Sequence, residues 1–281
     1  SLMKKFFSII LSIFITTNVY SDSISNNISG YIGNLIPGTG DTEVSIDLRE
    51  NFKPDYSILG VREIEKPSNG NLFTQFSIFN TEKNNDDRNV LNLGFGKRIL
   101  NDDKTMVTGF NAFLDFDEIG NKRSSLGFEV KNSVLDFGYN YYIGIDDGTD
   151  EKVLDGYDLR LASQVPFMHW ADIFVNSYEW DGRDRDDIKG MQFGSELLLN
   201  PNLNLELAYD DKDKKGLEDE WYAKIIFIHP PSTGPSLKDG LISDTAWKEE
   251  KDMSGELLSK VKRNNKIMIE FKGSATISRT D

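Results

Sequence analysis

Histidine and cysteine, residue types that often carry catalysis or bind metals, are scarce in this chain. It has 281 residues with no cysteine, and its two histidines are His169 and His229. Without cysteine there is no thiolate metal ligand, no disulfide and no cysteine nucleophile. General acid–base mechanisms most often use a histidine near the reacting groups, but each of these histidines falls at the end of an apolar segment, beside a turn. We therefore predict that both are turn or interfacial residues, that there are no catalytic residues, and that the protein is not an enzyme.

Acidic side chains are the remaining candidates for chemistry. The chain has 46 Asp and Glu against 32 Lys and Arg, which leaves a formal net charge of −14. This charge argues against a nucleic-acid partner, because Lys and Arg supply most of the affinity for phosphate backbones. Two acidic runs, 144–151 and 181–187, could offer oxygen ligands to Ca²⁺, but neither has the ligand spacing of a calcium-binding loop. We predict hydrated external loops with no bound metal or cofactor; the alternative is that divalent cations bridge these loops to lipopolysaccharide.

The N-terminus indicates the compartment. Met3-Lys4-Lys5 is followed by an apolar stretch over 6–15 and then by small and polar residues up to Ser21. This order is typical of a secretory signal peptide, and the apolar stretch is too short for a membrane-spanning helix, which needs about 20 residues. We assign 1–21 to a signal peptide and 22–41 to a periplasmic N-terminal segment. The mature chain is therefore expected to be exported, and the absence of cysteine suits an oxidising periplasm.

The body of the chain alternates between apolar and polar residues with a period of two. Between residues 106 and 116, Phe110 and Leu114 fall on one face of an extended segment, and Asn111 and Asp115 fall on the other. Successive side chains of a strand point to opposite faces, so each such strand has one apolar face and one polar face that also contains glycines. The same pattern recurs at 126–131, 135–143, 157–162 and 203–210.

We predict about twelve strands between residues 42 and 229, most of them 9 to 13 residues long. They centre near 43–50, 56–64, 71–81, 88–99, 104–116, 121–131, 133–143, 155–165, 169–180, 187–199, 202–211 and 218–229. A tilted membrane-spanning strand needs about 9–11 residues, and bacterial barrels have an even number of strands. A soluble β-sandwich shares the alternation and is the alternative. The mean hydropathy of −0.44 excludes a helical membrane protein but not a barrel, since lumen-facing residues alternate with lipid-facing ones.

The connections between these strands alternate in length. Long acidic connections fall at 82–88, 146–155, 181–187 and 210–220, and short ones at 132–133, 166–168 and 200–201. Outer-membrane barrels have long external loops and short periplasmic turns. Backbone polar groups cannot be left unpaired in hydrocarbon, so the sheet must close. We predict an all-β fold, a 12-stranded antiparallel transmembrane β-barrel over 42–229.

The polar face of this barrel would line its lumen. The charged and amide side chains predicted to point inward are Asp115, Glu129, Asp136, Asp158, Arg160, Asn204, Glu206 and Lys224. Their plain role is to fill the lumen with ion pairs and water. Their functional role would be to hold a segment of the chain inside the barrel or to filter solutes.

The pattern changes after residue 229. The segment 230–235 contains three prolines, which cannot continue a paired strand. Helical spacing predicts a helix over about 245–263, Asn264-Asn265 ends it, and 266–272 is expected to be a strand. One helix and one strand cannot form a core of their own. We therefore expect this segment to dock inside the barrel lumen.

Several short motifs together resemble one family. They are LGFGKR at 93–98, GFNAFLDFD at 109–117, SLGFE at 125–129, GYDLR at 156–160 and VKRNNKIMIEF at 261–271. Over roughly residues 42–272 the chain resembles the translocator of inverse autotransporters, the intimin/invasin family of bacterial outer-membrane adhesins. A single glycine-containing strand would be weak evidence, but the order of the motifs and the Arg-Asn-Asn sequence near the end make the resemblance specific.

The resemblance implies a barrel in the bacterial outer membrane, reached through the periplasm. In that family the C-terminal linker passes through the pore and carries a passenger of Ig-like adhesion domains outward. Residues expected to belong to the pore linker are Trp247, Leu257, Leu258, Arg263, Asn264 and Asn265, although Trp247, Leu257 and Leu258 could instead pack on a passenger. Expected partners are outer-membrane lipid and lipopolysaccharide, the barrel-assembly machinery and periplasmic chaperones. A host or cell-surface receptor would be reached only through a passenger.

Two departures from the family pattern bear on function. Only residues 273–281 follow the region of resemblance, and 22–41 does not contain the peptidoglycan-binding module that many members carry. Taken as it stands, the chain is expected to be a translocator without its passenger: a truncated form, a gene fragment, or a stand-alone outer-membrane pore that reuses the fold.

Overall fold

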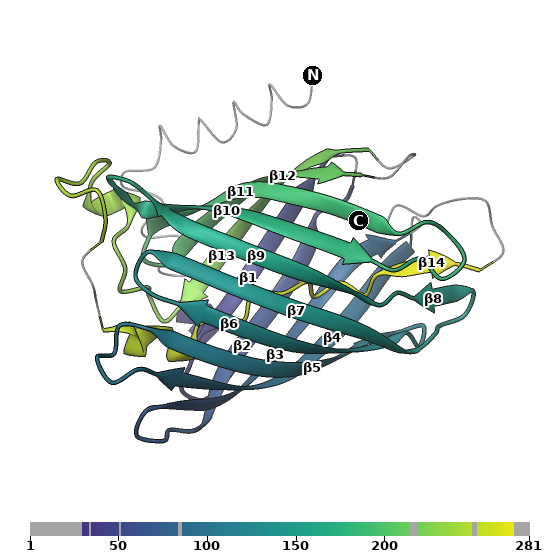
Figure 1. Ribbon diagram of the computed structural model, residues 1–281, viewed down its shortest axis with the longest axis horizontal. Coiled ribbons are helices and arrows are strands. Elements are labelled where there is room, and N and C mark those ends of the chain that lie inside the picture. Colours follow the sequence, from purple (N-terminus) through teal and green to yellow (C-terminus); the bar gives the residue numbers. More distant parts are fainter. Residues whose placement is uncertain are drawn as a thin grey trace.

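The computed structural model describes residues 30–33, 35–50, 52–83, 86–213, 218–248 and 252–272. The predicted signal peptide at 1–21, part of the segment 22–41 and the tail 273–281 lie outside the described residues. Within the described part, the dominant element is a single closed sheet that surrounds a C-terminal segment of the same chain (Figure 1).

Twelve antiparallel strands form the barrel, in the spatial order β1-β13-β12-β11-β10-β9-β7-β6-β5-β4-β3-β2. Their bounds are β1 Thr42–Arg49, β2 Asp55–Glu65, β3 Gly70–Lys83, β4 Asp86–Leu100, β5 Val107–Asp117, β6 Lys122–Lys131, β7 Leu135–Asp146, β9 Gly156–Val165, β10 Met168–Trp180, β11 Ile188–Asn200, β12 Leu203–Lys212 and β13 Glu220–His229. Pairing of β1 with both β2 and β13 closes the sheet. The predicted 12-stranded barrel is confirmed, with strand positions close to those expected.

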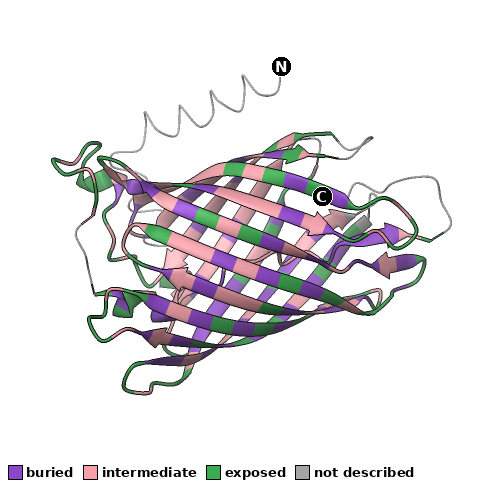
Figure 2. Ribbon diagram, in the orientation of Figure 1, coloured by how far each residue is buried: buried purple, intermediate pink, exposed green. Residues whose placement is uncertain are grey.

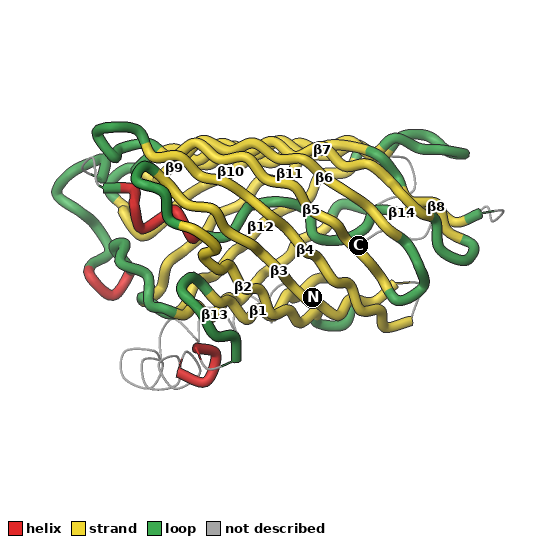
Figure 3. The backbone as a smooth tube through the Cα atoms, turned by 90° about the horizontal axis from the view of Figure 1, so that it is seen from below, coloured by secondary structure: helices red, strands yellow, loops and turns green. Residues whose placement is uncertain are grey.

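The two ends of the barrel differ, as the connection lengths predicted. Thr42 pairs with His229, so the barrel sheet begins and ends on one side, which we call the inner end. The two-residue turns 166–167 and 201–202 lie at this end, and the longer loops 181–187 and 147–155, which contains β8, lie at the opposite, outer end (Figure 3). One predicted loop is wrong: most of 82–88 is strand, because β3 and β4 pair up to their last residues.

Each strand alternates between an exposed and a buried face (Figure 2). Phe110 on β5 and Leu126 on β6 are exposed on the outside of the barrel, 54% and 62%, which suits contact with lipid. Asp115 on β5 is fully buried on the inside. Inward glycines make room for aromatic rings, since a Cβ at Gly94 would lie 2.1 Å from Cε1 of Phe113. The predicted assignment of the apolar face to the outside is confirmed by this pattern.

The segment after the barrel differs from expectation in its local structure. It contains two 3-10 helices, η1 Leu237–Asp239 and η2 Met253–Leu258, and a short strand, β14 Ile269–Phe271. The helix predicted over about 245–263 is wrong: 245–247 is bent, 253–258 is a 3-10 helix, and 260–263 has no regular secondary structure, while 249–251 lies outside the described residues. The strand predicted over 266–272 is shortened to three residues, because its partner β8, Glu151–Val153, is itself that short. No helix among the described residues is long and apolar enough to cross a membrane.

The physical reason for the missing helix is that barrel residues take the hydrogen bonds a helix would have used. The Phe167 backbone N–H donates to the carbonyl of Ala246, with N and O 2.8 Å apart. The Arg98 guanidinium donates to the carbonyls of Leu257 and Ser259. Backbone groups bonded to side chains of the wall leave no free partner for an i→i−4 ladder.

Candidate functional site

The C-terminal segment 252–272, which we call the linker, runs through the inside of the barrel from its inner to its outer end (Figure 1). Its first part, η2, lies against β2 to β5. Its middle part, Lys260–Met268, lines a cavity in the lumen. Its last part, β14, pairs with β8 in the loop between β7 and β9. The candidate site is the set of contacts that hold this linker in place.

Apolar contacts hold the linker at the inner end. Leu257 is buried with Met253 and with Leu100 and Val107 of the wall. Leu258 packs against a second cluster, which consists of Leu59, Val61, Phe73, Phe113 and Val261. These two predicted linker residues therefore contact the barrel wall. Trp247 does not join them, since it precedes the linker and remains 48% exposed.

A buried arginine of β4 fixes the chain just beyond η2. Arg98 has no exposed surface, and its Nε lies 2.6 Å from Oε1 of Glu129. Its Nη1 donates to the carbonyl oxygen of Leu257 at 3.0 Å, and its guanidinium lies over the ring of Phe73, 4.5 Å from the centroid. Lys131 gives Glu129 a second cation at 3.3 Å. The Arg98 guanidinium therefore joins the wall to the linker backbone without an unpaired charge.

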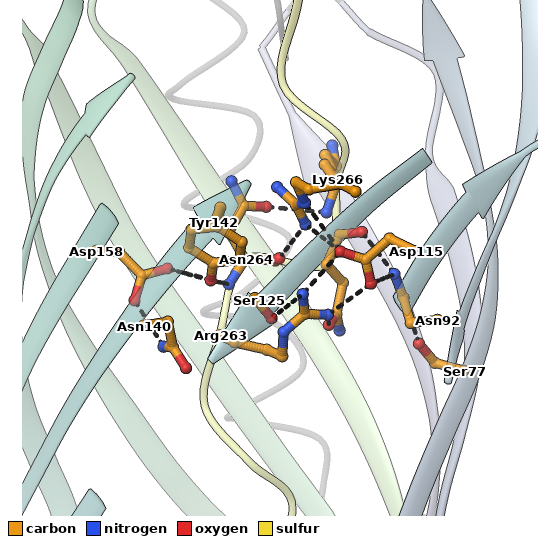
Figure 4. A network of polar contacts seen from close by, with 12 residues as sticks. Ser77, Asn92, Asp115, Ser125, Asn140, Tyr142, Asp158, Arg263, Asn264 and Lys266 are labelled. Carbon is orange, nitrogen blue, oxygen red and sulfur yellow. Dashed lines mark hydrogen bonds and ion pairs between the residues drawn. The ribbon is translucent and has the colours of Figure 1, made fainter. Parts of the chain in front are cut away.

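The centre of the linker is held by Asp115, a carboxylate between two arginines (Figure 4). Arg263 of the linker donates to both carboxylate oxygens, at 3.0 and 2.8 Å, and Nε of Arg123 on β6 lies 2.8 Å from Oδ2. Asn92 donates to Oδ1 at 2.7 Å. The side chains of Asp115, Arg123 and Arg263 are all fully buried. A bidentate arginine–carboxylate pair fixes orientation as well as distance, so this group locks the linker in one position. We call it the Asp115 lock.

The paired asparagines beside Arg263 supply backbone contacts to the same region. The N–H of Asn264 donates to the hydroxyl of Tyr142 at 2.8 Å, and its carbonyl accepts from Arg123 at 2.8 Å. The carbonyl of Asn265 accepts from Asn92, with N and O 2.9 Å apart. Tyr142 in turn donates to Asp158 at 2.6 Å. An extended segment with no neighbouring strand thus has backbone groups satisfied by side chains of the wall.

Three lysines of the linker reach across the lumen to other strands. Lys260 lies 2.6 Å from Glu43 of β1, and Lys266 lies 2.8 Å from Asp55 of β2. Lys262 pairs with Glu196 of β11. These side chains keep between 17% and 24% of their surface exposed, so they remain in contact with the open part of the lumen.

That open part is a cavity of about 300 Å³ beside the linker. Its walls come mainly from β1, β2 and β9 to β13, and they include four of the predicted lumen residues, Asp158, Arg160, Glu206 and Lys224. Arg160 pairs with Glu196 at 2.6 Å. Two further predicted residues, Asp136 and Asn204, occupy inward positions of β7 and β12 but are not among the residues that line the cavity.

Loops at the outer end of the barrel bind the last part of the linker. The carboxylate of Glu270 in β14 accepts the backbone N–H groups of Arg183 and Asp184, at 3.2 and 2.7 Å. Glu151 of β8 forms a bidentate pair with Arg88 of β4, at 2.9 and 2.8 Å. Next to these polar contacts, apolar residues of the wall, β8 and the linker form one buried cluster: Phe79, Val90, Val153, Ile267 and Ile269. The linker therefore leaves the lumen through a closed exit.

Carboxylates of the two acidic loops have protein partners. Arg183 donates to both oxygens of Asp147, each at 2.8 Å, and Lys152 pairs with Asp184. The hydrogen bond from Lys152 lowers the pKa of Asp184. Among the residues the structure describes, no group of three or more acidic or histidine side chains is arranged to hold a metal ion.

The histidines lie at the inner end. His169 is at the start of β10, where its Nε2 lies 2.9 Å from the carbonyl oxygen of Thr245, and His229 is the last residue of β13.

Several site residues were not identified from the sequence, although some signals were present. Arg98 falls on the inward face of the LGFGKR motif, and Arg123 pairs directly across the sheet from Asp115. The strand alternation was sufficient to place both on the inward face of the barrel, but not to show that they contact the linker. Arg88 and Glu151 were unpredictable, because their pairing depends on how the loop carrying β8 folds over the outer end.

The sequence of the barrel matches one known family. The family model for the inverse autotransporter β-domain matches residues 14–265, which is most of the chain. The chain belongs to the inverse autotransporter β-domain family. The barrel is therefore of a bacterial outer-membrane type, and family and fold are of a non-enzymatic kind.

One solved structure supports the fold, and two more distant ones are also similar to parts of the chain. A structure described as "Unveiling the Mechanism Behind the in-meso Crystallization of Membrane Proteins" is similar over 83% of this chain and 99% of its own, with a TM-score of 0.65 and 17% identity. A KdgM porin covers 66% of this chain and 98% of its own at 9% identity, with a TM-score of 0.47. An outer-membrane channel from Pseudomonas putida F1 covers 69% and 96% at 10% identity, also with a TM-score of 0.47. No curated protein matches the chain.

Proposed function

We propose that this inverse autotransporter barrel anchors its C-terminal linker in the outer membrane, exports it through the lumen, and displays whatever follows it on the outside. The observation that supports this most directly is the continuous path of the linker, fixed near the middle of the lumen by the Asp115 lock. A segment that only plugged a pore would need contacts at one level. This linker is bound at the inner end, in the middle and at the outer end.

The mechanism has no chemical step. Apolar contacts of Leu257 and Leu258 close the inner end around the linker. Arg263 then meets Asp115, and withdrawing the arginine would break a bidentate ion pair that is fully buried. Breaking such a pair costs several kcal/mol, even though Asp115 keeps Arg123. Pairing of β14 with β8 completes the arrangement outside. The linker is thus retained once it is in place, and a passenger of the adhesin type would be tethered to the membrane through it.

A C-terminal epitope tests this function. An epitope added after Asp281 should be accessible to antibody on intact cells. The same epitope added after Pro231, before the linker, should be accessible only after the outer membrane is opened. Heat-modifiable gel mobility shows that both barrels are folded. Equal shielding of the two epitopes in folded barrels would exclude display through the lumen.

A stand-alone pore is the second candidate, and the cavity beside the linker is the observation that favours it. Conductance in planar bilayers separates the two. We expect the whole chain to conduct weakly and a chain ending at Pro231 to conduct far more. If both folded barrels conduct equally, the linker does not obstruct the lumen and the pore interpretation is preferred.

The remaining expectations concern partners and activity. We propose no enzymatic activity, because both histidines are at the inner end, away from the buried carboxylates of the lock. Outer-membrane lipid and lipopolysaccharide would surround the barrel, and periplasmic chaperones and the barrel-assembly machinery would insert it. Nucleic acid is not expected as a partner. A receptor would be bound only by a passenger.

A further inference from the structure

Charges in the cavity are divided unevenly between the wall and the linker. The wall contributes eight carboxylates, Glu43, Asp47, Asp55, Asp158, Glu196, Glu206, Asp210 and Glu220, and four cations, Arg49, Arg160, Lys212 and Lys224. The linker contributes four cations, Lys260, Lys262, Arg263 and Lys266, and no carboxylate. Without the linker, the lining would keep eight carboxylates and four cations.

The four cations of the wall already have carboxylate partners within the wall. Each of the four is within salt-bridge distance of a wall carboxylate: Arg49 of Asp55, Arg160 of Glu196, Lys212 of Glu220 and Lys224 of Asp47. Of the carboxylates left over, Asp158 and Asp210 accept hydrogen bonds from tyrosine hydroxyls, at 2.6 and 2.9 Å.

The three lysines of the linker form ion pairs with carboxylates of the wall. Lys260 lies 2.6 Å from Glu43, a carboxylate not otherwise bound to a wall cation in the cavity. Lys262 and Lys266 add second cations to Glu196 and Asp55. The three lysines are spaced along an extended backbone so that they reach β1, β11 and β2, on the side of the lumen away from the Asp115 lock.

We propose that the wall of the lumen is a binding site for an extended basic peptide, and that without such a peptide the lumen conducts cations selectively. This inference rests on the proposed function, in which the linker belongs in the lumen. A narrow passage with low-dielectric walls and an excess of one charge concentrates the opposite ion. Carboxylates lining a pore select cations in this way. In the full chain the linker occupies this channel, and its lysines neutralise carboxylates of the wall.

Selectivity in planar bilayers tests the inference. Under a potassium chloride gradient, the reversal potential of a chain ending at Pro231 should indicate clear preference for K⁺ over Cl⁻. The full chain carrying Lys260→Gln, Lys262→Gln and Lys266→Gln keeps Arg263, so its linker should stay in place. That variant should be several-fold more cation-selective than the unchanged chain. Anion preference, or no preference in either conducting barrel, would overturn the inference.

A synthetic peptide of residues 259–272 provides the binding half of the test. Added to the chain ending at Pro231, it should reduce the current, and added salt should weaken the block because the contacts are ionic. The matched control peptide has glutamine in place of the three lysines and should block much less. Equal block by both peptides would show that shape alone, without charge, drives binding.

The outcomes keep this inference separate from the proposed function. If removal of the linker leaves conductance unchanged, the linker does not occupy the pore and the proposed function fails, whereas the reversal potential still reports the charge of the wall. If the chain ending at Pro231 does not reach the folded position on gels, the lysine variant of the full chain decides the question alone.

Discussion

The two sides of the lumen hold the same linker in different ways. The side formed by β3 to β7 contacts it directly, through buried groups such as Arg98, Asp115 and Tyr142. The side formed by β1, β2 and β9 to β13 faces the cavity, and beside the cavity it reaches the linker mainly through long lysine side chains such as Lys262. Its apolar contacts are at the two ends, where Val61 packs with Val261 and Trp180 packs with Met268. We call these the packed side and the open side. The middle of the linker is therefore not centred in the pore but bound mainly to one wall.

The difference has an energetic consequence. Ion pairs that keep contact with water contribute about 0–1 kcal/mol each. Removal of one partner of a buried pair costs about 3–5 kcal/mol, because the other charge is left unpaired. The packed side should therefore determine whether the linker stays in the barrel, and the open side should determine mainly which ions pass.

Replacement of Asp115 by alanine should have the largest effect. Arg123 and Arg263 would remain buried with no carboxylate between them, so we expect a loss of about 3–5 kcal/mol in the free energy of unfolding. The temperature at which the barrel shifts to its unfolded position on gels reports this loss.

Glu206→Gln is the matched control on the open side. Glu206 accepts from Tyr222 at 2.9 Å and faces the cavity, so we expect a loss under about 1 kcal/mol. The comparison of the two sides fails if both variants lose similar stability. Adding Arg263→Gln to Asp115→Ala should cost less than the two single losses combined, since the residues are coupled.

Truncation of Leu257 should have the next largest effect. The side chain is buried among Leu100, Val107 and Met253, and a Leu→Ala change at such a site costs about 2–5 kcal/mol. Limited proteolysis of the folded barrel should then cut the linker faster at its inner end.

Trp247→Ala is the control for this truncation. Trp247 is larger but half exposed, and it lies before the linker. We expect little change in either unfolding or proteolysis. Faster cleavage in the tryptophan variant than in the leucine variant would mean that the contacts that hold the linker at the inner end lie outside the lumen.

The strand pattern alone predicted the barrel, its inner and outer faces and the inward position of Asp115. This succeeded because a period of two is a local property that closure of the sheet preserves. The helix over 245–263 was predicted from the same kind of local pattern and was wrong. There, Arg98 and other wall groups compete for the backbone of Leu257, and that competition depends on tertiary structure. The asymmetry of the lumen was equally invisible, because the alternation gives every strand the same polar face.

Asp41 connects the two sides at the inner end and should make stability depend on pH. Burial raises its pKa to about 7, and the carboxylates of Glu43 on the open side and Glu256 in η2 of the linker add to the rise. The cations of Arg98 and Arg62 oppose it. In the unfolded chain the group ionises near 3.8, so folding loses stability as the pH rises from about 4 to about 7.

The variant Asp41→Asn removes this dependence. It should be more stable than the unchanged chain at about pH 8 and nearly equal to it at about pH 4. We expect a difference of about 1–2 kcal/mol, less than the full shift implies because the side chain keeps some contact with water. Urea unfolding in lipid vesicles, followed by tryptophan fluorescence at both pH values, measures it. Equal stability differences at the two pH values would exclude Asp41 as the titrating group.

Lys262→Gln should change stability least, and it is the sharpest test of the comparison. Lys262 and Arg263 are neighbours in sequence, but their side chains bind opposite sides of the lumen. Lys262 keeps 22% of its side-chain surface exposed, and Glu196 keeps Arg160 at 2.6 Å when the lysine is gone, so we expect a loss under about 1 kcal/mol. Asp115 likewise keeps Arg123, but Arg263 is fully buried and bidentate. Arg263→Gln, measured beside it in the same unfolding experiment, should therefore lose more. If the two neighbours contribute equally, the linker is held evenly from both walls and the open side is as much a part of the lock as the packed side.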